Sequence, residues 1–334
     1  MSVTECPNVL RSQHHATQKG TVMKTFPLPG TDILAPNVVL GLMRIADKSD
    51  EEIRALVHEA RDAGIDFFDH ADVYGNELYQ CERRFAEAMR LTPSERDEIT
   101  IQTKAGIVKQ DGPYFDFSYD HIIESVDGSL KALGTDRIDI LLLHRPDALV
   151  EPEEVARAFD DLEAAGKVLH FGVSNHTPRQ IDLLRKFVRQ PIVANQLQLS
   201  ITHQPIIAQG LAANMAGESQ SVTLDGGGIL DYCRVNDITV QAWSPFQAGF
   251  FNGVFLGSPE YPELNKVIDR LAELHDVPPM AIATAWITRH PAQMQVVLGT
   301  TNPDRVSEAA RGSDLELTRA EWYELFRASG HLIP

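Results

Sequence analysis

The sequence is poor in cysteine and has no long apolar run. Three cysteines, Cys6, Cys81 and Cys233, stand far apart among 334 residues, without any C-x-x-C spacing. They form neither a disulfide framework nor a zinc site, and they suit a reducing compartment. No apolar run approaches the roughly 18 residues of a membrane span. The first 20 residues lack the basic and apolar regions of a signal peptide, so we expect a cytoplasmic protein.

Cations are also scarce, because 30 lysines and arginines face 47 aspartates and glutamates, which leaves a net charge of −17. A nucleic-acid binder needs clustered cations to displace phosphate counterions, and anionic membranes attract the same clusters. The charge therefore argues against both partners, whereas a few local cations would still suffice for an anionic cofactor. We expect a monomer or a weak homo-oligomer.

Strand-like and helix-like segments alternate along the chain. Strands are expected at residues 38–40, 65–68, 99–103, 138–143, 167–174, 192–196, 238–243 and 294–299, each followed by helix-like sequence. Ser49 with Glu52, and Thr177 with Gln180, have the spacing of capping boxes at helix starts. Such alternation implies parallel strands joined by helical crossovers. Eight units favour an α/β fold of the closed (β/α)8 TIM barrel type.

The alternative fold is an open, doubly wound sheet. Such a sheet, when it binds a dinucleotide, shows G-x-G-x-x-G after its first strand, but residues 39–47 read VLGLMRIAD. Residues 21–34 suggest a β-hairpin ahead of the barrel, with Pro29 and Gly30 at its turn. Residues 318–329 supply an extra helix at the C-terminus. We expect a polar arm over residues 1–20 and one barrel over residues 21–334.

Two expected loops are long, at residues 203–228 and 244–260. Long loops on a compact barrel are usually functional or mobile. For the first of them, a tolerated surface insertion is an equally good interpretation.

Polar side chains gather where the expected strands end. In barrel enzymes the active site lies at these carboxyl ends. Asp69 closes the second strand with Tyr74 in the following loop, Lys104 closes the third, and His144 closes the fourth. Taken singly, each has an ordinary explanation as a turn, packing or solvated residue. Together, at three successive strand ends, they indicate a site.

This grouping has a chemical use. A tyrosine hydroxyl has a pKa of about 10, and a neighbouring lysine cation lowers it by stabilising the phenolate. A carboxylate would hold the lysine charged, and a histidine would orient a substrate carbonyl. Protonating a carbonyl oxygen while hydride reaches its carbon is general acid catalysis, and the hydride must come from a cofactor.

Residues 67–75, FFDHADVYG, resemble the D-x-A-x-x-Y signature of the aldo-keto reductases. Further motifs follow in that family's order, namely TKAG, LLLHRPD, GKVLHFGVSN, ANQLQLS, QAWSP and VLGTTNPDRVSEA. Together they cover essentially all of residues 21–334. The sequence is most similar to a bacterial branch whose members are labelled oxidoreductases.

The resemblance implies roles for particular residues. Tyr74 would be the proton donor, Lys104 would tune it, Asp69 would pair with Lys104, and His144 would orient the carbonyl. His70 and Asp72 are assigned to packing or to the loop. The residues implied for cofactor binding are Met43, Arg44, Ser174, Asn175, Gln196, Trp243, Ser244, Pro245, Phe246, Ala248, Gly249, Gly299, Thr300, Thr301, Asn302 and Arg305.

The implied cofactor is NADP, used as NADPH, and NAD stays open. Many family members start the last motif with a lysine that binds the 2′-phosphate, where this chain has Gly299. The work of that lysine would fall to Thr300, Thr301, Asn302 and Arg305, since hydroxyls and one guanidinium with two parallel donors can bind a phosphate. The implied substrate is a small carbonyl compound.

Two other functions remain as alternatives. The first is an NADP(H)-binding barrel that acts as a regulatory or channel-associated subunit with little turnover. The second is a metal-dependent hydrolase barrel, which needs clustered ligands such as H-x-H on an early strand. Neither FFDHAD nor TKAG supplies that spacing, so we predict no metal site.

Overall fold

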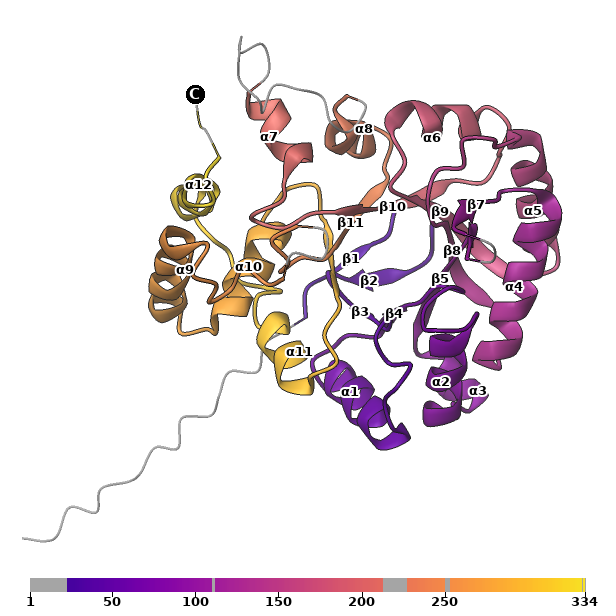
Figure 1. Ribbon diagram of the computed structural model, residues 1–334, viewed down its shortest axis with the longest axis horizontal. Helices are drawn as coiled ribbons and strands as arrows, with labels where there is room; N and C mark the ends of the chain where they lie inside the picture. Colours follow the sequence, from indigo (N-terminus) through magenta and orange to yellow (C-terminus); the bar gives the residue numbers. More distant parts are fainter. Residues whose placement is uncertain (1–22, 110–111, 213–226, 250–252, 332, 334) are drawn as a thin grey trace, which may run out of the picture.

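Eight parallel strands close into a barrel that is surrounded by helices (Figure 1). The structure is a computed structural model that describes residues 23–109, 112–212, 227–249, 253–331 and 333. The barrel strands are β3 (Val38–Gly41), β4 (Phe67–Asp69), β5 (Thr100–Ala105), β8 (Ile138–Leu143), β9 (Val168–Ser174), β10 (Ile192–Gln198), β11 (Thr239–Trp243) and β12 (Gln295–Leu298). β12 pairs with β3 and so completes the ring. The predicted (β/α)8 barrel is confirmed; the polar arm expected over residues 1–20 lies outside the described residues.

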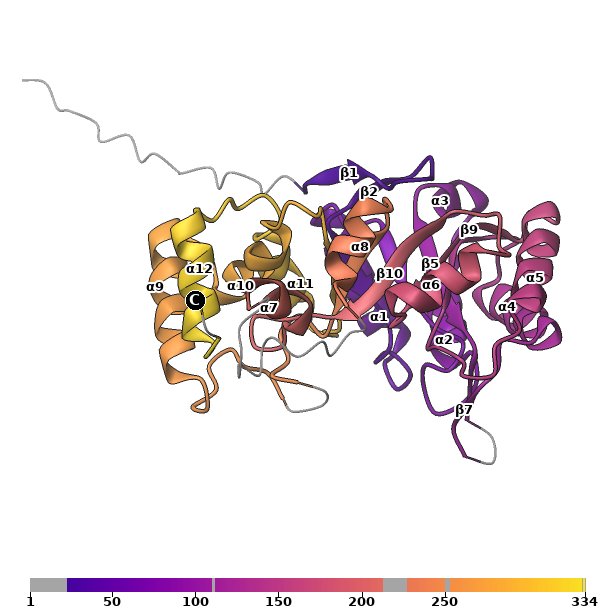
Figure 2. The same cartoon turned by 90° about the horizontal axis from the view of Figure 1, so that it is seen from above.

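The helices follow the strands as the alternation predicted. They are α1 (Asp50–Asp62), α2 (Gln80–Met89), α4 (Tyr119–Leu133), α5 (Pro152–Ala164), α6 (Pro178–Arg185), α8 (Ile229–Val235), α9 (Pro262–His275), α10 (Pro279–Thr288), α11 (Pro303–Ala310) and α12 (Arg319–Ala328). Both predicted capping boxes are present, at the starts of α1 and α6. In Figure 2 the extra helix α12 lies beside α9, on the opposite side of the molecule from α4 and α5.

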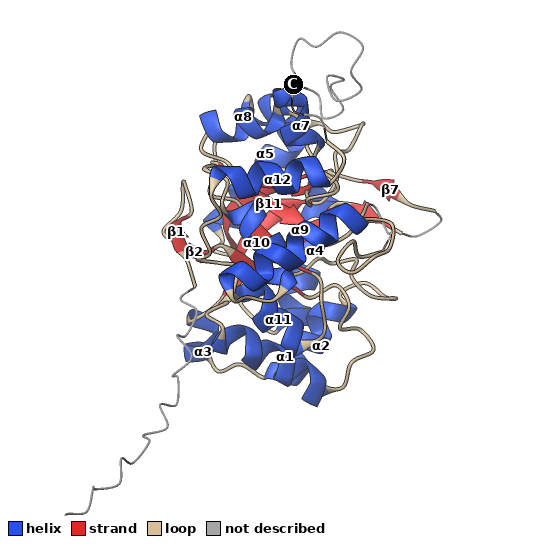
Figure 3. Ribbon diagram, turned by 90° about the vertical axis from the view of Figure 1, so that its left-hand side faces the viewer, coloured by secondary structure: helices blue, strands red, loops and turns tan. Residues whose placement is uncertain are grey.

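The predicted N-terminal hairpin is also present. β1 (Thr25–Pro27) and β2 (Leu34–Pro36) pair antiparallel, and Gly30 takes a φ of 75° in the turn between them. Figure 3 shows this hairpin at one end of the barrel and β7 at the other. Phe26 and Leu28 are buried in a cluster with inward-facing residues of the barrel strands. The hairpin therefore closes the end of the barrel that lies away from the strands' carboxyl ends.

Some elements differ from the prediction. α2 begins at Gln80 and not at residue 77, because Tyr79 takes a left-handed φ of 60°. The sequence interpretation missed α3 (Pro93–Asp97), the β6–β7 hairpin (Ile107–Val108 and Tyr114–Phe115), and α7 (Pro205–Leu211) inside the first long loop. Residues 213–226 of that loop lie outside the described part. In the described part, no helix is both long and apolar enough to cross a membrane.

Candidate active site

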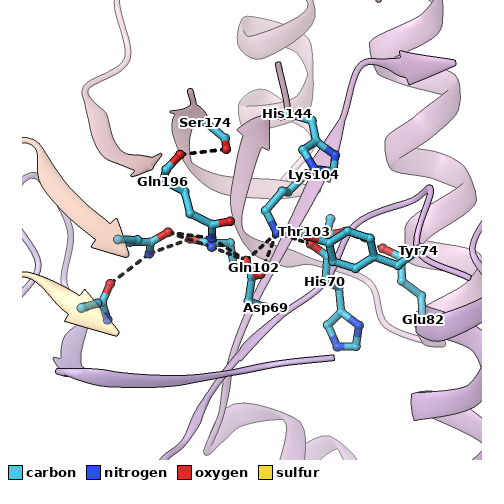
Figure 4. Close-up of polar contacts among 12 residues, drawn as sticks. Asp69, His70, Tyr74, Glu82, Gln102, Thr103, Lys104, His144, Ser174 and Gln196 are labelled. Carbon is cyan, nitrogen blue, oxygen red and sulfur yellow. Dashed lines mark hydrogen bonds and ion pairs between the residues drawn. The ribbon is translucent and has the colours of Figure 1, made fainter. Parts of the chain in front are cut away.

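Asp69, Tyr74 and Lys104 lie in contact at the carboxyl ends of β4 and β5 (Figure 4). The Lys104 Nζ donates to both carboxylate oxygens of Asp69, at 2.8 and 2.7 Å, and lies 3.2 Å from the Tyr74 hydroxyl. The side chains of Lys104 and Asp69 are 0% and 3% exposed. Residues that the sequence singled out at the ends of two strands therefore lie in contact in the structure.

The backbone fixes Lys104 as firmly as the side chains do. The Lys104 ammonium also donates to the carbonyl oxygen of His70, at 2.7 Å, which uses all three of its directions together with Asp69 and Tyr74. The Lys104 carbonyl accepts from the Asp72 amide at 3.1 Å, which ties β5 to the loop that carries Tyr74. The cation is thus held in one position relative to the phenol.

The charges of this group differ in one respect from the sequence expectation. Burial alone would lower the pKa of Lys104, but Asp69 and Tyr74 raise it, so the ammonium stays charged. Burial raises the pKa of Tyr74, and Lys104 only partly opposes that rise. Lys104 lowers the Tyr74 pKa, as the sequence predicts, but the desolvation of the phenol outweighs that effect. Tyr74 therefore keeps its proton at neutral pH.

His144 stands against Tyr74. The two rings meet edge to face, with centroids 5.8 Å apart at 83°. Burial lowers the pKa of His144 well below its usual value, and the charge of Lys104 lowers it further. The imidazole is therefore neutral, and its Nδ1 has no hydrogen-bond partner among the described residues. This nitrogen is buried as well as unpartnered, and the neutral ring that carries it stands next to the phenol.

Behind these residues lies a second set of buried titratable groups. His70 is fully buried and packs on Phe85 with ring centroids 5.0 Å apart, as its assignment to packing predicts. Burial lowers the pKa of His70 to about 3. Asp72 and Glu82 are 2% and 0% exposed, and burial raises their pKa values to about 8 and about 7. At pH 7, His70 and Asp72 are therefore mostly uncharged, and Glu82 is close to the midpoint of its titration.

A chain of glutamine amides crosses the barrel interior, and the sequence interpretation missed it. Gln102 Nε2 donates to Asp69 at 2.6 Å and to Gln241 at 3.0 Å, and Gln241 Nε2 donates to Gln295 at 2.9 Å. Gln295 Nε2 in turn reaches the carbonyl of Pro36 in the hairpin, at 2.8 Å. These glutamine amides hold the Asp69 carboxylate from the barrel interior. Its only sequence signal was a glutamine at equivalent inward positions of three strands.

Comparison with known proteins agrees with this geometry. The sequence model of the aldo/keto reductase family matches residues 37–328. The chain belongs to the aldo/keto reductase family. It is 36% identical over 306 residues to "Oxidoreductase YdhF" of Escherichia coli (strain K12), covering 89% of this chain and 94% of that one.

Two further relatives have a similar sequence identity to this chain. The chain is 34% identical over 317 residues to "Uncharacterized oxidoreductase YcsN" of Bacillus subtilis (strain 168), covering 91% and 97% of the two chains. It is 33% identical over 300 residues to "6-dehydroglucose reductase" of Agrobacterium fabrum (strain C58 / ATCC 33970), covering 86% and 92%. As an aldo/keto reductase the protein is an oxidoreductase, of a family that generally uses NADH or NADPH.

Around the mouth of this aldo/keto reductase barrel lie the residues expected at a nicotinamide. Ser174 donates to the Gln196 carbonyl at 2.9 Å, and Asn175 Nδ2 donates to Ser174 Oγ at 2.8 Å. The Trp243 indole donates to Asn175 Oδ1 at 3.1 Å. Gln196 Nε2 donates to the Asp69 carboxylate at 3.0 Å, while Gln196 Oε1 has no hydrogen bond within the described residues. These groups offer a carboxamide both donors and acceptors beside an indole ring.

The phosphate-binding candidates lie on two other strand ends. Arg44 donates to the Gly299 carbonyl at 2.7 Å and links the loops after β3 and β12, next to Met43. Asn302 caps α11, and Arg305 is exposed in its first turn without an ion pair among the described residues. Helix amides and arginines are the donors that phosphates prefer, so the residues present fit a dinucleotide. The remaining candidates Ser244, Pro245, Phe246, Ala248 and Gly249 form the turn after β11, and Thr300 and Thr301 precede Asn302.

Metal-ligating side chains do not gather in the described part of the chain. No group of three or more His, Cys, Asp or Glu residues there has the geometry to hold a metal ion. Cys81 and Cys233 are buried, and neither forms a disulfide within the described residues.

Proposed function

We propose that the protein reduces aldehydes or ketones to alcohols with NADPH, and that Tyr74 is the proton donor. The observation that carries this proposal is the Tyr74 hydroxyl, 3.2 Å from a buried ammonium and edge-on to a neutral imidazole. A phenol in that position can give its proton to a carbonyl oxygen placed between the Tyr74 and His144 side chains.

Each residue then has one task. Bound NADPH would supply the hydride to the carbonyl carbon. Tyr74 keeps its proton until negative charge develops on the substrate oxygen, and Lys104 stabilises the phenolate that remains. Asp69 keeps Lys104 charged and in place. His144, being neutral, orients the carbonyl without an imidazolium proton that would compete with Tyr74 as the donor.

The cofactor preference is part of the proposal. Ser174, Asn175 and Gln196 Oε1 would hold the carboxamide, and Trp243 would stack on the ring. Arg305, with Thr300, Thr301 and Asn302, would hold the 2′-phosphate in place of a lysine. The exposed guanidinium of Arg305 supports NADPH over NADH.

The substitution Tyr74→Phe tests the proposal. It removes the proton but keeps the ring, so reduction of a panel of aldehydes and ketones should fall by at least about a thousandfold, while NADPH binding stays unchanged. NADPH and NADH consumption measures turnover, and fluorescence titration measures binding. A variant that remained active would contradict the role of Tyr74. A native protein that binds NADPH but oxidises it with no carbonyl tested would favour the regulatory subunit instead.

A further inference from the structure

Arg145 extends over the mouth of the barrel. It follows His144 directly at the end of β8, and its Cζ lies 5.8 Å from the ring centroid of Trp243 at the end of β11. β9 and β10 separate these two strands in the barrel. Neighbouring strands lie about 4.8 Å apart, so the guanidinium has to reach across the opening to meet the indole. Its charge also contributes to the lowered pKa of His144, which places the guanidinium close to the candidate site.

Among the described residues, this guanidinium has no carboxylate partner. It makes neither an ion pair nor a hydrogen bond there, although acidic residues outnumber basic ones by 47 to 30 in the whole sequence. The carboxylate nearest in sequence, Asp147, accepts instead from the backbone amides of Phe117 at 3.1 Å and Leu149 at 2.8 Å. Within the described residues, the aromatic face of Trp243 is therefore the partially negative group that this guanidinium contacts.

A second arginine shows the usual arrangement. Arg157, on the outer surface of α5, lies 4.5 Å from the ring centroid of Tyr119 and 3.7 Å from Glu154. Arg145 has the same kind of aromatic contact without the acid. An arginine that is partly buried and unpaired is unfavourable in the unliganded protein, because its desolvated charge is not compensated.

A second cation stands on the same side of the site. Lys109 Nζ donates to the carbonyls of Val73, at 2.6 Å, and Gly75, at 3.3 Å, on either side of Tyr74. Its charge, like that of Arg145, reaches His144. Two cations, Arg145 and Lys109, thus lie near His144 in a protein of net charge −17.

We propose that Arg145 binds an oxyanion, a carboxylate or a phosphate, on the carbonyl substrate. The inference rests on the proposed function, since it places the oxyanion on the molecule whose carbonyl lies at Tyr74 and His144. A guanidinium presents a planar pair of donors that matches either group bidentately. The natural substrate is then an anionic aldehyde or ketone, and Arg145 is a specificity-determining residue.

Two substrate pairs test the assignment. Succinic semialdehyde is compared with butanal, and glyceraldehyde 3-phosphate with glyceraldehyde, so that the two arms distinguish a carboxylate from a phosphate. The native enzyme should have the higher kcat/KM for the anionic member of at least one pair. Arg145→Gln should lower that value about tenfold to one hundredfold, mainly through KM, and leave the neutral member within about threefold. Arg145→Lys should restore part of the loss, and Arg157→Gln should change nothing.

Binding is measured in parallel, so that the assignment does not depend on turnover. Calorimetric titration of the NADPH complex with succinate and with glycerol 3-phosphate should show binding in the native protein and in Tyr74→Phe, and loss in Arg145→Gln. Absent turnover with intact, Arg145-dependent oxyanion binding would refute the proposed reduction and keep the oxyanion site. Equal losses for charged and neutral substrates, or weaker NADPH binding without loss of discrimination, would overturn the role of Arg145.

Discussion

At the scale of single residues, Lys104 and Asp69 form a buried ion pair on which both stability and the proposed chemistry depend. Removing one member of such a pair leaves an uncompensated charge and typically costs about 3–5 kcal/mol, whereas replacing both by apolar groups costs far less. We expect Lys104→Met to lower the free energy of unfolding by about that amount and to abolish reduction. Urea unfolding and NADPH consumption measure the two effects.

The matched control is the double variant Lys104→Met/Asp69→Leu. It should recover most of the lost stability, because no charge remains buried, but none of the activity. If the double variant were as unstable as the sum of the two single variants, the residues would not be coupled as a pair.

Glu82 makes the stability depend on pH. Its pKa is about 7 in the folded protein against 4.5 for a free carboxyl, so between these values the folded state holds a proton that the unfolded state has released. The stabilising contribution is complete below pH 4.5 and disappears as the pH rises through 7, on the order of 3 kcal/mol in all. Glu82→Gln keeps an acceptor for Thr103, which donates to Glu82 at 2.5 Å, but cannot ionise.

The measurement is the free energy of unfolding at several values between pH 4.5 and 8. The native protein should lose stability with rising pH more steeply than Glu82→Gln does. Part of the slope should persist in the variant, because Asp72 has a raised pKa of about 8 and faces the same pocket. Parallel curves for the two proteins would show that Glu82 does not titrate in this range.

Residues at strand ends were predictable, and those inside the barrel were not. Asp69 and Lys104 stand at the ends of β4 and β5, and His144 directly follows β8. The apolar character of these strands is plain in the sequence, so their ends could be predicted. Gln102 and Gln241 form their network only because the register of β5 and β11 sets them at one level. A single polar residue within an apolar run does not specify that register.

At the scale of elements, two glycines in helices test how closely α4 packs against the loop before α2. A Cβ at Gly128 would overlap the ring of Tyr79, whereas one at Gly210, on the exposed side of α7, would meet nothing within 4 Å. Alanine in a helix gains up to about 1 kcal/mol over glycine, but overpacking costs about 1–3 kcal/mol. We expect Gly128→Ala to destabilise the protein and Gly210→Ala to be neutral or stabilising, as measured by urea unfolding. Equal effects would mean that Tyr79 moves aside freely.

The starts of helices were predicted correctly where a capping box was recognised in the sequence. The capping boxes at Ser49 and Thr177 gave the starts of α1 and α6 correctly. The same signal, Thr92 with Glu95, starts α3 and was overlooked. The start of α2 was not predictable, since it depends on the left-handed conformation of Tyr79, a residue type that rarely adopts it. Local signals therefore define an element only where no tertiary contact overrides them.

At the scale of the whole molecule, the hairpin and the glutamine chain connect the two ends of the barrel. The hairpin closes one end, and Gln295 joins its Pro36 carbonyl to the amide chain that ends on Asp69. The alternation of strands and helices predicted the barrel, because it is a repeating pattern. The turn at Pro29 and Gly30 predicted the hairpin, because it is a local one. Neither pattern predicted that the hairpin is linked to Asp69 through this chain, which depends on the contact between Gln295 and Pro36, 259 positions apart.

Leu28 tests whether the hairpin acts as a structural plug. It is fully buried in the cluster that fills the hairpin end of the barrel, whereas Leu34 of the same hairpin is 61% exposed. Leu28→Ala leaves a cavity and should lower the free energy of unfolding by about 2–5 kcal/mol in one cooperative transition. Leu34→Ala should change it by less than about 0.5 kcal/mol. Far-UV circular dichroism in urea measures both, and reduction by the folded Leu28→Ala protein should stay near the native rate because Tyr74 lies at the other end. Similar effects of the two substitutions would show that the barrel is stable without its plug.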